Sequence, residues 1–154
     1  MSYSISEEYL SEDKIAELFE LAKLHNDEVG EFEDSEFSID TETYIKLQDM
    51  NIAKAFIARD IETFNAVGYI IYLIMAHPHF KDVLIAKEDG LFVYKSHRGS
   101  MLGYKLIRYA DSVLSDKYGV DAITQTATEK FDHSKMLIKL GYSKIETTYI
   151  RRLT

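Results

Sequence analysis

The segment from Arg98 to Tyr104 has the residue types of an anion-binding loop. It opens a stretch whose apolar residues recur at helical spacing. The first amides of a helix have no acceptor within it, and together with the helix dipole they attract anions. Glycine lets the backbone approach a phosphate closely, and a forked guanidinium suits phosphate oxygens. The sequence therefore predicts a phosphate or diphosphate site formed by Arg98, Gly99, Ser100, Met101, Leu102, Gly103 and Tyr104.

The composition argues against several other chemistries. The 154-residue chain has no cysteine, which excludes thiolate metal sites and acyl-cysteine chemistry. His77 and His79 lie two residues apart, but two ligands do not make a metal site, and no metal is expected. The chain has 18 Lys+Arg and 26 Asp+Glu, and its net charge of −8 argues against broad binding of nucleic acid. The same charge leaves cationic partners such as amines open.

The length and composition predict one globular domain over residues 1–154. Hydrophobic residues make up 46% and charged residues 29%, and 7 Gly with 1 Pro form no linker. The longest apolar run, Tyr69 to Ala76, is far shorter than the ~20 residues of a membrane helix. The first 13 residues are acidic and do not resemble a leader. We therefore expect a cytoplasmic protein that does not bind membranes.

The element that must position the anion loop is an amphipathic helix over about 100–117, which Gly119 ends. Apolar segments at 83–86 and 91–94 precede it. Between them, Glu88-Asp89-Gly90 forms either a tight hairpin turn or a bulge in one long strand, and the residues leave both open. Residues 25–40 hold seven acids without Lys or Arg, which predicts a surface loop.

The remaining patterns complete a mixed α/β sheet with helices on its faces. Ser11 caps a predicted helix over 12–24, and Gly141 ends another over 133–140. A further short helix is expected over 41–50, capped by Thr41. Strands are expected over 52–60, 64–76, 121–127 and 145–151, the last from the alternation of Ile145, Thr147 and Tyr149.

The segment from Leu91 to Leu106 resembles the acyl-CoA loop of the GCN5-related N-acetyltransferases (the GNAT family). That loop has the pattern Arg/Gln-x-x-Gly-x-Gly/Ala. Arg98 and Gly103 match it, and Met101 stands at the middle glycine. A helix ending in Leu140-Gly141-Tyr142 resembles the second family signature, about 40 residues later. The His79-Phe80-Lys81 turn makes the chain most similar to small acetyltransferases carried by tailed phages.

The resemblance implies a GNAT-like fold, in which a mixed, mostly antiparallel central sheet is flanked by helices. It also implies an acetyl-CoA-dependent N-acetyltransferase, whose acceptor amine, on a small molecule or a protein lysine, attacks the thioester directly. In such a protein the backbone of Phe92, Val93 and Tyr94 would pair with the pantetheine arm of acetyl-CoA. The amides from Gly99 to Tyr104 would hold its diphosphate.

Direct attack needs a base for the amine and a proton donor for the leaving thiolate. Asp89 and Glu88 are the candidate bases. Asp89 shares the parity of Leu91 and Val93 in a regular strand, whereas a bulge favours Glu88. Leu137 stands where the family often has a donor tyrosine. His133, Ser134, a tyrosine elsewhere or water would then have to serve as the donor.

The resemblance places the acidic segment 25–40 beside the acceptor site. A negative rim there would attract a polyamine, an aminoglycoside or a protein lysine. Two alternatives stay open. Leu137 and Met101 favour a CoA-binding protein with weak or no activity, and the net charge permits an acidic protein that acts by contact, such as a nucleic-acid mimic. The apolar strand and the 11 tyrosines are compatible with a homodimer.

Overall fold

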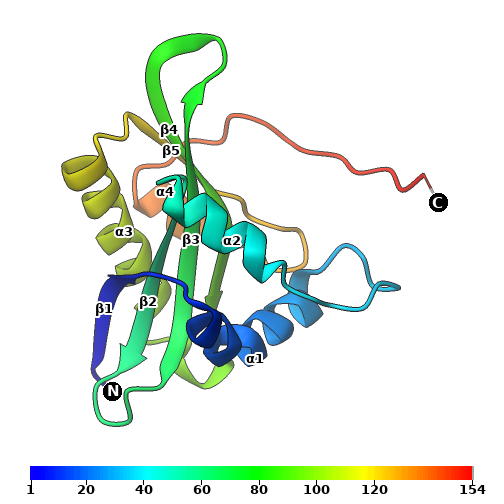
Figure 1. Cartoon of the computed structure of the whole chain (residues 1–154), viewed down its shortest axis with the longest axis vertical. Coiled ribbons are helices and arrows are strands. Elements are labelled where there is room, and N and C mark those ends of the chain that lie inside the picture. Colours follow the sequence, from blue (N-terminus) through cyan, green and yellow to red (C-terminus); the bar gives the residue numbers. More distant parts are fainter. Residues whose placement is uncertain (154) are drawn as a thin grey trace.

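A single five-stranded sheet, in the order β1-β2-β3-β4-β5, organises the computed structural model, which describes residues 1–153 (Figure 1). The first four strands form antiparallel pairs, and β5 runs parallel to β4. This confirms the mixed, mostly antiparallel sheet. The strands are β1 (Tyr3–Glu8), β2 (Ala53–Asp60), β3 (Ala66–His77), β4 (Phe80–Val93) and β5 (Ala122–Thr124).

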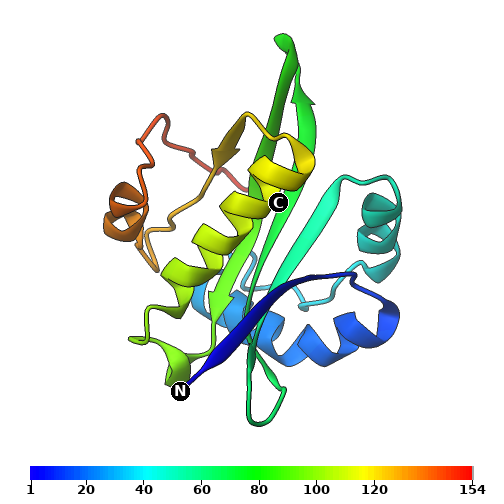
Figure 2. The ribbon, with the colours of Figure 1, turned by 90° about the vertical axis from the view of Figure 1, so that its left-hand side faces the viewer.

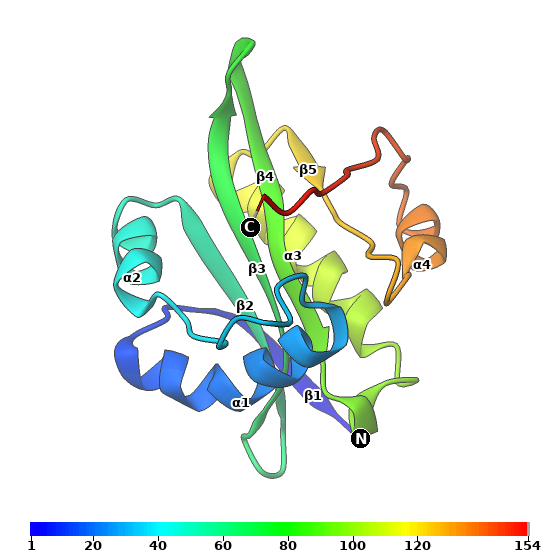
Figure 3. The same cartoon turned by 90° about the vertical axis from the view of Figure 1, so that its right-hand side faces the viewer.

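Helices cover both faces of this sheet and enclose two apolar cores. Helix α3 (Leu102–Tyr118) packs on one face against alternate residues of β2 such as Phe56 (Figure 2). Helix α1 (Glu12–Val29) packs on the other face against Ala55 and Ile57, with α2 (Thr41–Asp49) beside it (Figure 3). The short α4 (Ser134–Lys139) contributes Leu137 to the α3 core. Because both faces are covered, β2 is buried along six of its eight residues.

A β-bulge at Asp89 decides the question that the sequence left open. Ile71 pairs with Gly90 and Tyr72 pairs with Glu88, so Asp89 is an extra residue on β4. The segments predicted at 83–86 and 91–94 therefore belong to one strand, and there is no hairpin turn between them. Glu88 and Leu91 are three residues apart, and the bulge lets both face α3. In a regular strand, residues three apart point to opposite faces of the sheet.

Strand β5 covers only part of the outer edge of β4. Residues Ile85 to Lys87 pair with Ala122 to Thr124, and the chain then turns away from β4 (Figure 3). From Glu88 to Val93, β4 pairs with β3 alone. The predicted strand 121–127 was thus too long, and its early end leaves a wedge between β4 and the segment after β5.

Strand β1 was not predicted, because most of its residues are polar. Tyr3 and Ile5 contact the α3 core. Its acidic residues pair with cations of neighbouring elements instead of facing solvent alone. Glu7 pairs with Lys117 at 2.9 Å, and Glu8 pairs with Arg59 at 2.8 Å. With these ion pairs, a segment whose composition predicts no strand forms an edge strand of the sheet.

The strand predicted over 145–151 is wrong. The structure gives this segment no regular element, and Ile145 and Tyr149 are 77% and 89% exposed. An alternating pattern forms a strand only when a sheet edge of matching length accepts it, and β5 has three residues. Arg152, near its end, pairs instead with Asp34 at 3.0 Å.

The helix predictions are confirmed except at their ends. Helix α1 is capped by Ser11, as predicted, but continues to Val29 rather than to residue 24, so residues 25–29 of the acidic segment are helical. Helix α2 is capped by Asp40 rather than by Thr41, and α4 spans 134–139 rather than 133–140. Gly119 and Gly141 adopt the predicted left-handed conformation. No helix among residues 1–153 is long and apolar enough to cross a membrane.

The buried side chain of Gln48 ties α2 to the loop between β1 and α1. Its Nε2 donates to the Leu10 carbonyl at 2.9 Å, and its Oε1 accepts from the Leu10 amide at 2.6 Å. Gln48 is 7% exposed and Leu10 is 3% exposed. One side chain therefore satisfies both backbone groups of a residue that water does not reach.

The variant Gln48→Ala should lower the free energy of unfolding by about 2–4 kcal/mol, because it leaves a buried donor and a buried acceptor unpaired. Lys46→Ala, an exposed change on the same helix, is the control and should stay within about 0.5 kcal/mol of wild type. Denaturant unfolding measures both. Equal stability of the two variants would contradict the role given to Gln48.

Candidate active site

The wedge between β4 and the segment after β5 holds a cavity of about 560 Å³, here called the wedge cavity. The bulged part of β4 forms one wall, and the start of α3 forms another. Of the residues predicted to bind acetyl-CoA, Tyr94 and Ser100 lie outside its lining. It gathers the predicted residues Glu88, Asp89, Phe92, Val93, Arg98, Gly99, Met101, Leu102, Gly103, Tyr104 and His133.

Two left-handed residues turn the chain from β4 into α3. Gly99 has φ +85°, and Met101, the residue before the helix, has φ +60°. The Lys105 amide is the first in the helix to find a backbone acceptor, the Met101 carbonyl at 3.0 Å. The amides of Leu102, Gly103 and Tyr104 precede it, so they have no acceptor within the helix. They start the helix at the wall of the wedge cavity, as the anion-site prediction requires.

Met101 occupies a conformation that favours glycine. Its side chain is 61% exposed and makes no cap hydrogen bond, so little packing offsets the strain of a left-handed residue. A glycine would adopt this backbone without strain, so Met101 holds it at a cost in stability.

Arg98 is held by protein groups in the structure. Its Nη2 donates to both carboxylate oxygens of Glu28 at 2.8 Å, and its Nε donates to the Val93 carbonyl at 2.8 Å. The guanidinium also lies over the rings of Phe92 and Phe131, 5.3 and 4.9 Å from their centroids. Arg98 thus joins α1 to the end of β4, and its contact with a diphosphate stays a prediction.

Glu88 is a buried carboxyl at the apex of the wedge. It is 9% exposed and accepts a hydrogen bond from the Thr126 amide at 3.2 Å. Burial raises the pKa of this carboxyl to about 7, against the weaker opposing effect of that amide. A carboxyl with a pKa near neutrality beside a cavity has the properties of a general base or acid.

His133 faces the same cavity with an unsatisfied atom. Its Nε2 is buried and has no hydrogen-bond partner among residues 1–153. Burial lowers the pKa of the imidazole, although the Phe131 carbonyl and Asp132 favour its charged form. A buried polar atom without a partner in a cavity wall fits a bound molecule that supplies the missing hydrogen bond.

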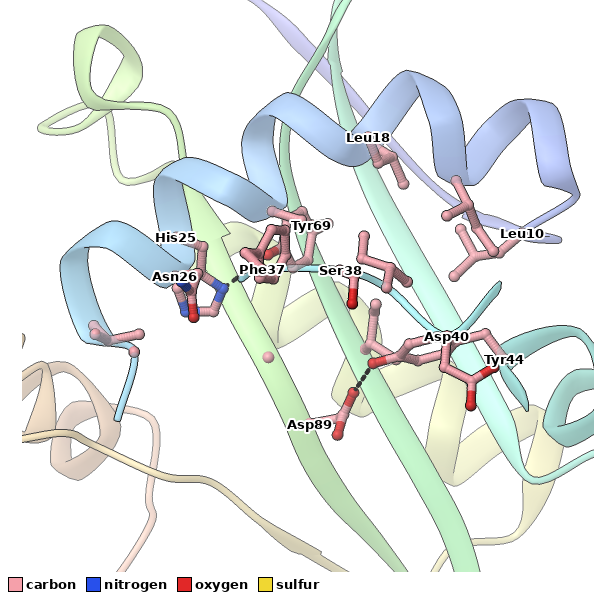
Figure 4. A pocket seen from close by; sticks show the side chains of 17 residues that line it. Leu10, Leu18, His25, Asn26, Phe37, Ser38, Asp40, Tyr44, Tyr69 and Asp89 are labelled. Atoms are coloured by element: carbon pink, nitrogen blue, oxygen red, sulfur yellow. Dashed lines mark hydrogen bonds between the residues drawn. The ribbon is translucent and has the colours of Figure 1, made fainter. Parts of the chain in front are cut away.

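A second cavity of about 310 Å³ lies between α1, α2 and the sheet and is here called the α1–α2 cavity (Figure 4). It shares His25, Val29, Asp89 and Gly90 with the lining of the wedge cavity. The bulge at Asp89 therefore stands where the two cavities meet. Asp89 accepts a hydrogen bond from the Tyr44 hydroxyl at 2.5 Å.

Sequence reasoning missed the aromatic residues of this junction. His25 Nδ1 hydrogen-bonds with the Tyr69 hydroxyl at 2.7 Å, and the imidazole stacks on Phe92. Burial lowers the pKa of His25 and raises that of Tyr44. The signal that locates His25 is the helical spacing of α1, which continues past residue 24. Nothing in the sequence marks Tyr44.

The two neighbouring histidines, His77 and His79, lie outside the linings of both cavities. His77 and His79 form the tip of the β3–β4 hairpin, and the His79 amide donates to His77 Nδ1 at 3.1 Å. Among the described residues, no group of three or more His, Asp or Glu side chains is placed to hold a metal ion.

The variant Met101→Gly should raise the free energy of unfolding by about 1 kcal/mol, because glycine adopts φ +60° without strain. Gly99→Ala tests the same physics in reverse. No atom lies within 4 Å of the added Cβ. The free energy of unfolding of Gly99→Ala should therefore fall by about 1 kcal/mol through backbone strain alone. Denaturant unfolding measures both. A destabilised Met101→Gly would contradict the left-handed backbone at residue 101.

The variant Glu88→Gln should change stability in a pH-dependent way. Below pH 4.5 the carboxyl is protonated in both folded and unfolded chains, so burial costs nothing extra. As pH rises from 4.5 through about 7, the unfolded chain ionises first, and wild type loses stability. Glutamine avoids this loss, so the variant should gain up to about 3 kcal/mol over wild type at pH 8 and little at pH 4. Equal differences at both pH values would contradict the raised pKa.

Comparison with known proteins shows likeness in structure only. No protein-family model matches the sequence, and no curated protein matches it. The fold is similar to that of a ribosomal-protein-alanine N-acetyltransferase from Brucella melitensis biovar Abortus, with TM-score 0.73, 16% identity, and coverage of 99% of this chain and 100% of that one. It is also similar to a glucosamine-6-phosphate N-acetyltransferase from Arabidopsis thaliana, with TM-score 0.74, 11% identity and full coverage of both chains.

A third similar structure is an aminoglycoside acetyltransferase from an uncultured soil metagenomic sample, in complex with sisomicin. It has TM-score 0.72 and 20% identity, and the match covers 99% of this chain and 97% of that one. These likenesses extend over nearly the whole length of every chain compared. The protein therefore has the acyl-CoA N-acyltransferase fold, the fold of the GNAT acetyltransferases.

Proposed function

We propose that the protein is an acetyl-CoA-dependent N-acetyltransferase. The observation that carries the proposal is that Glu88 is buried at the apex of the wedge and has a pKa of about 7. The start of α3 forms another wall of the same cavity. This arrangement puts a base and a set of free amides on one cavity. The likeness to three N-acetyltransferases supports the same reaction class.

The residues lining the wedge cavity fit acetyl-CoA, which supplies the acetyl group as a thioester. The amides of Leu102, Gly103 and Tyr104 would hold the diphosphate. The pantetheine arm would hydrogen-bond to the edge of β4 around Phe92 and Val93, where β4 lacks a partner strand. The resemblance of the sequence predicts the same contact. The unsatisfied Nε2 of His133 would gain a partner in the same cavity. Tyr94 and Ser100 lie beside this lining and keep only a predicted role.

Glu88 serves as the base in this proposal, and the bulge favours it over Asp89. An acceptor ammonium gives its proton to the Glu88 carboxylate, directly or through a water molecule. The amine nitrogen then forms the bond to the acetyl carbon as the carbon–sulfur bond breaks. The departing thiolate takes up the second proton, which the nitrogen sheds as it becomes an amide, relayed by His133 or by water. Leu137 cannot supply it, because its side chain is apolar and buried in the core.

The acceptor amine would enter from the α1–α2 cavity, which meets the wedge cavity at Asp89. The carboxyl group of Asp89 would attract an ammonium group to this junction. The similar enzymes are named for amines of different kinds, which are a protein alanine, an aminoglycoside and an amino sugar phosphate. A cytoplasmic location, a phage origin and a homodimer stay predictions from the sequence.

A CoA-binding protein with little activity is the second candidate. Leu137, which is 7% exposed, favours it, because leucine has no proton to give to a thiolate. The two candidates differ in one measurement. Both bind acetyl-CoA, but only the enzyme releases thiol from it when an amine is added.

Acetyl-CoA at saturating concentration should raise the melting temperature of the wild-type protein, because a ligand that binds only the folded state stabilises it. Gly103→Ala should fold normally, since the added methyl group meets Met136 and Val93 only at van der Waals distance. The methyl group stands in the wall of the wedge cavity, so acetyl-CoA affinity should fall at least tenfold. Ser112→Ala, on the exposed face of α3, is the control and should bind normally. Unchanged affinity of Gly103→Ala would contradict the assigned loop.

Thiol release from acetyl-CoA with a panel of amines tests the enzyme and its base. The wild-type kcat should rise with pH up to about 7 and then level, because the ionised Glu88 is the active form. Glu88→Gln should lower kcat at least 100-fold and leave the acetyl-CoA KM unchanged. Asp89→Asn is the matched comparison and should have the smaller effect on kcat. The reverse order would make Asp89 the base.

A further inference from the structure

The α1–α2 cavity has an apolar end and a polar end. Leu10, Ile15 and Leu18 are buried and form one end, and Phe37, Ile39 and Ile71 continue the apolar wall. Figure 4 shows His25 and Asp89 on the other side, away from Leu10 and Leu18. The polar end is the part that the two cavities share. A molecule whose amine reaches Asp89 would thus extend its remainder along apolar side chains.

Most acids of the segment 25–40 lie outside the lining of this cavity. Glu28 pairs with Arg98, Glu33 pairs with Lys130, and Asp34 pairs with Arg152. Asp40 lines the cavity, but both of its carboxylate oxygens accept hydrogen bonds from Thr43 as the cap of α2. Three of the seven acids in the segment 25–40 are therefore paired with cations of the chain, whereas Asp40 keeps its charge where it is exposed to solvent.

Of the two carboxylates in this lining, Asp89 stands at the junction with the wedge cavity, whereas Asp40 caps α2. The junction thus offers one carboxylate to one ammonium group. A polyamine or an aminoglycoside would bring further ammonium groups against Leu10, Ile15 and Leu18, where each would lose its water without gaining a partner. An apolar body loses nothing there, and its burial is favourable.

We infer that the acceptor is a primary amine carried on a compact apolar body, aliphatic or aromatic, which binds with its nitrogen at Asp89 and its body against the apolar wall of the α1–α2 cavity. This inference rests on the proposed acetyltransferase function and narrows its substrate class. The cavity volume of about 310 Å³ is at the small end of ligand sites, which suits an amine of this size.

Thiol release with matched amines tests the inference on the full-length protein. 2-Phenylethylamine and 3-methylbutylamine are the apolar probes, ethanolamine lacks the apolar body, and spermidine and kanamycin are the polycations. The apolar probes should have a kcat/KM at least tenfold above that of ethanolamine and of both polycations, since each buried methylene contributes to discrimination. A higher kcat/KM for spermidine or kanamycin would overturn the inference and leave the acetyltransferase assignment intact.

Phe37 provides the matched variants, because it lies in the loop between α1 and α2, half-buried against Phe19. Phe37→Ala removes part of the apolar wall and should lower kcat/KM for 2-phenylethylamine about tenfold, whereas Phe37→Leu should stay within threefold of wild type. Neither variant should change the acetyl-CoA KM. Equal values for 2-phenylethylamine in all three proteins would overturn the inference.

Amine binding without turnover separates this inference from the proposed function. If no amine releases thiol, the melting temperature is measured with each amine alone at equal ionic strength. A larger rise with 2-phenylethylamine than with spermidine, reduced in Phe37→Ala, would support the apolar acceptor site. Equal or smaller rises would overturn it. The melting shift with acetyl-CoA tests the cofactor site independently.

Discussion

The extra residue in β4 is the constraint on which the rest of the candidate site depends. Asp89 shifts the register with β3, so that Glu88 and Leu91 both face α3 while Phe92 faces α1. Next to this point β5 ends its pairing, and the outer edge of β4 becomes free. The bulge thus places a carboxyl in a buried position beside an open strand edge. A regular strand would leave that carboxyl on the other face or break one of the two cores.

The bulge also lies where the two cavities meet. His25 and Asp89 belong to both linings, and the ion pair of Arg98 with Glu28 holds α1 against the end of β4. The start of α3, the end of α1 and the bulge therefore form one connected junction. In the proposed two-substrate reaction, this junction is where the molecules in the two cavities would meet.

Local patterns in the sequence were sufficient to predict helix α3 and the glycine-containing loop before it, whereas anion binding by that loop stays a prediction. Apolar spacing and two left-handed glycines define their ends, and the loop geometry explains the unusual Met101. The bulge was one of two open alternatives, since a Glu-Asp-Gly sequence fits a turn equally well. The sequence could not predict that β1 forms or that residues 145–151 form no strand, because both outcomes depend on partners distant in sequence. Ion pairs with Arg59 and Lys117 stabilise the first, and a three-residue β5 cannot support the second.

Titration of the ¹⁵N-labelled protein with acetyl-CoA, followed by amide chemical shifts, locates the acetyl-CoA site. The largest shifts should occur at Gly99 to Tyr104 and along β4 from Glu88 to Val93, the two walls of the wedge cavity. Shifts at the β3–β4 hairpin tip or in the segment 145–151, with these two walls unchanged, would contradict it.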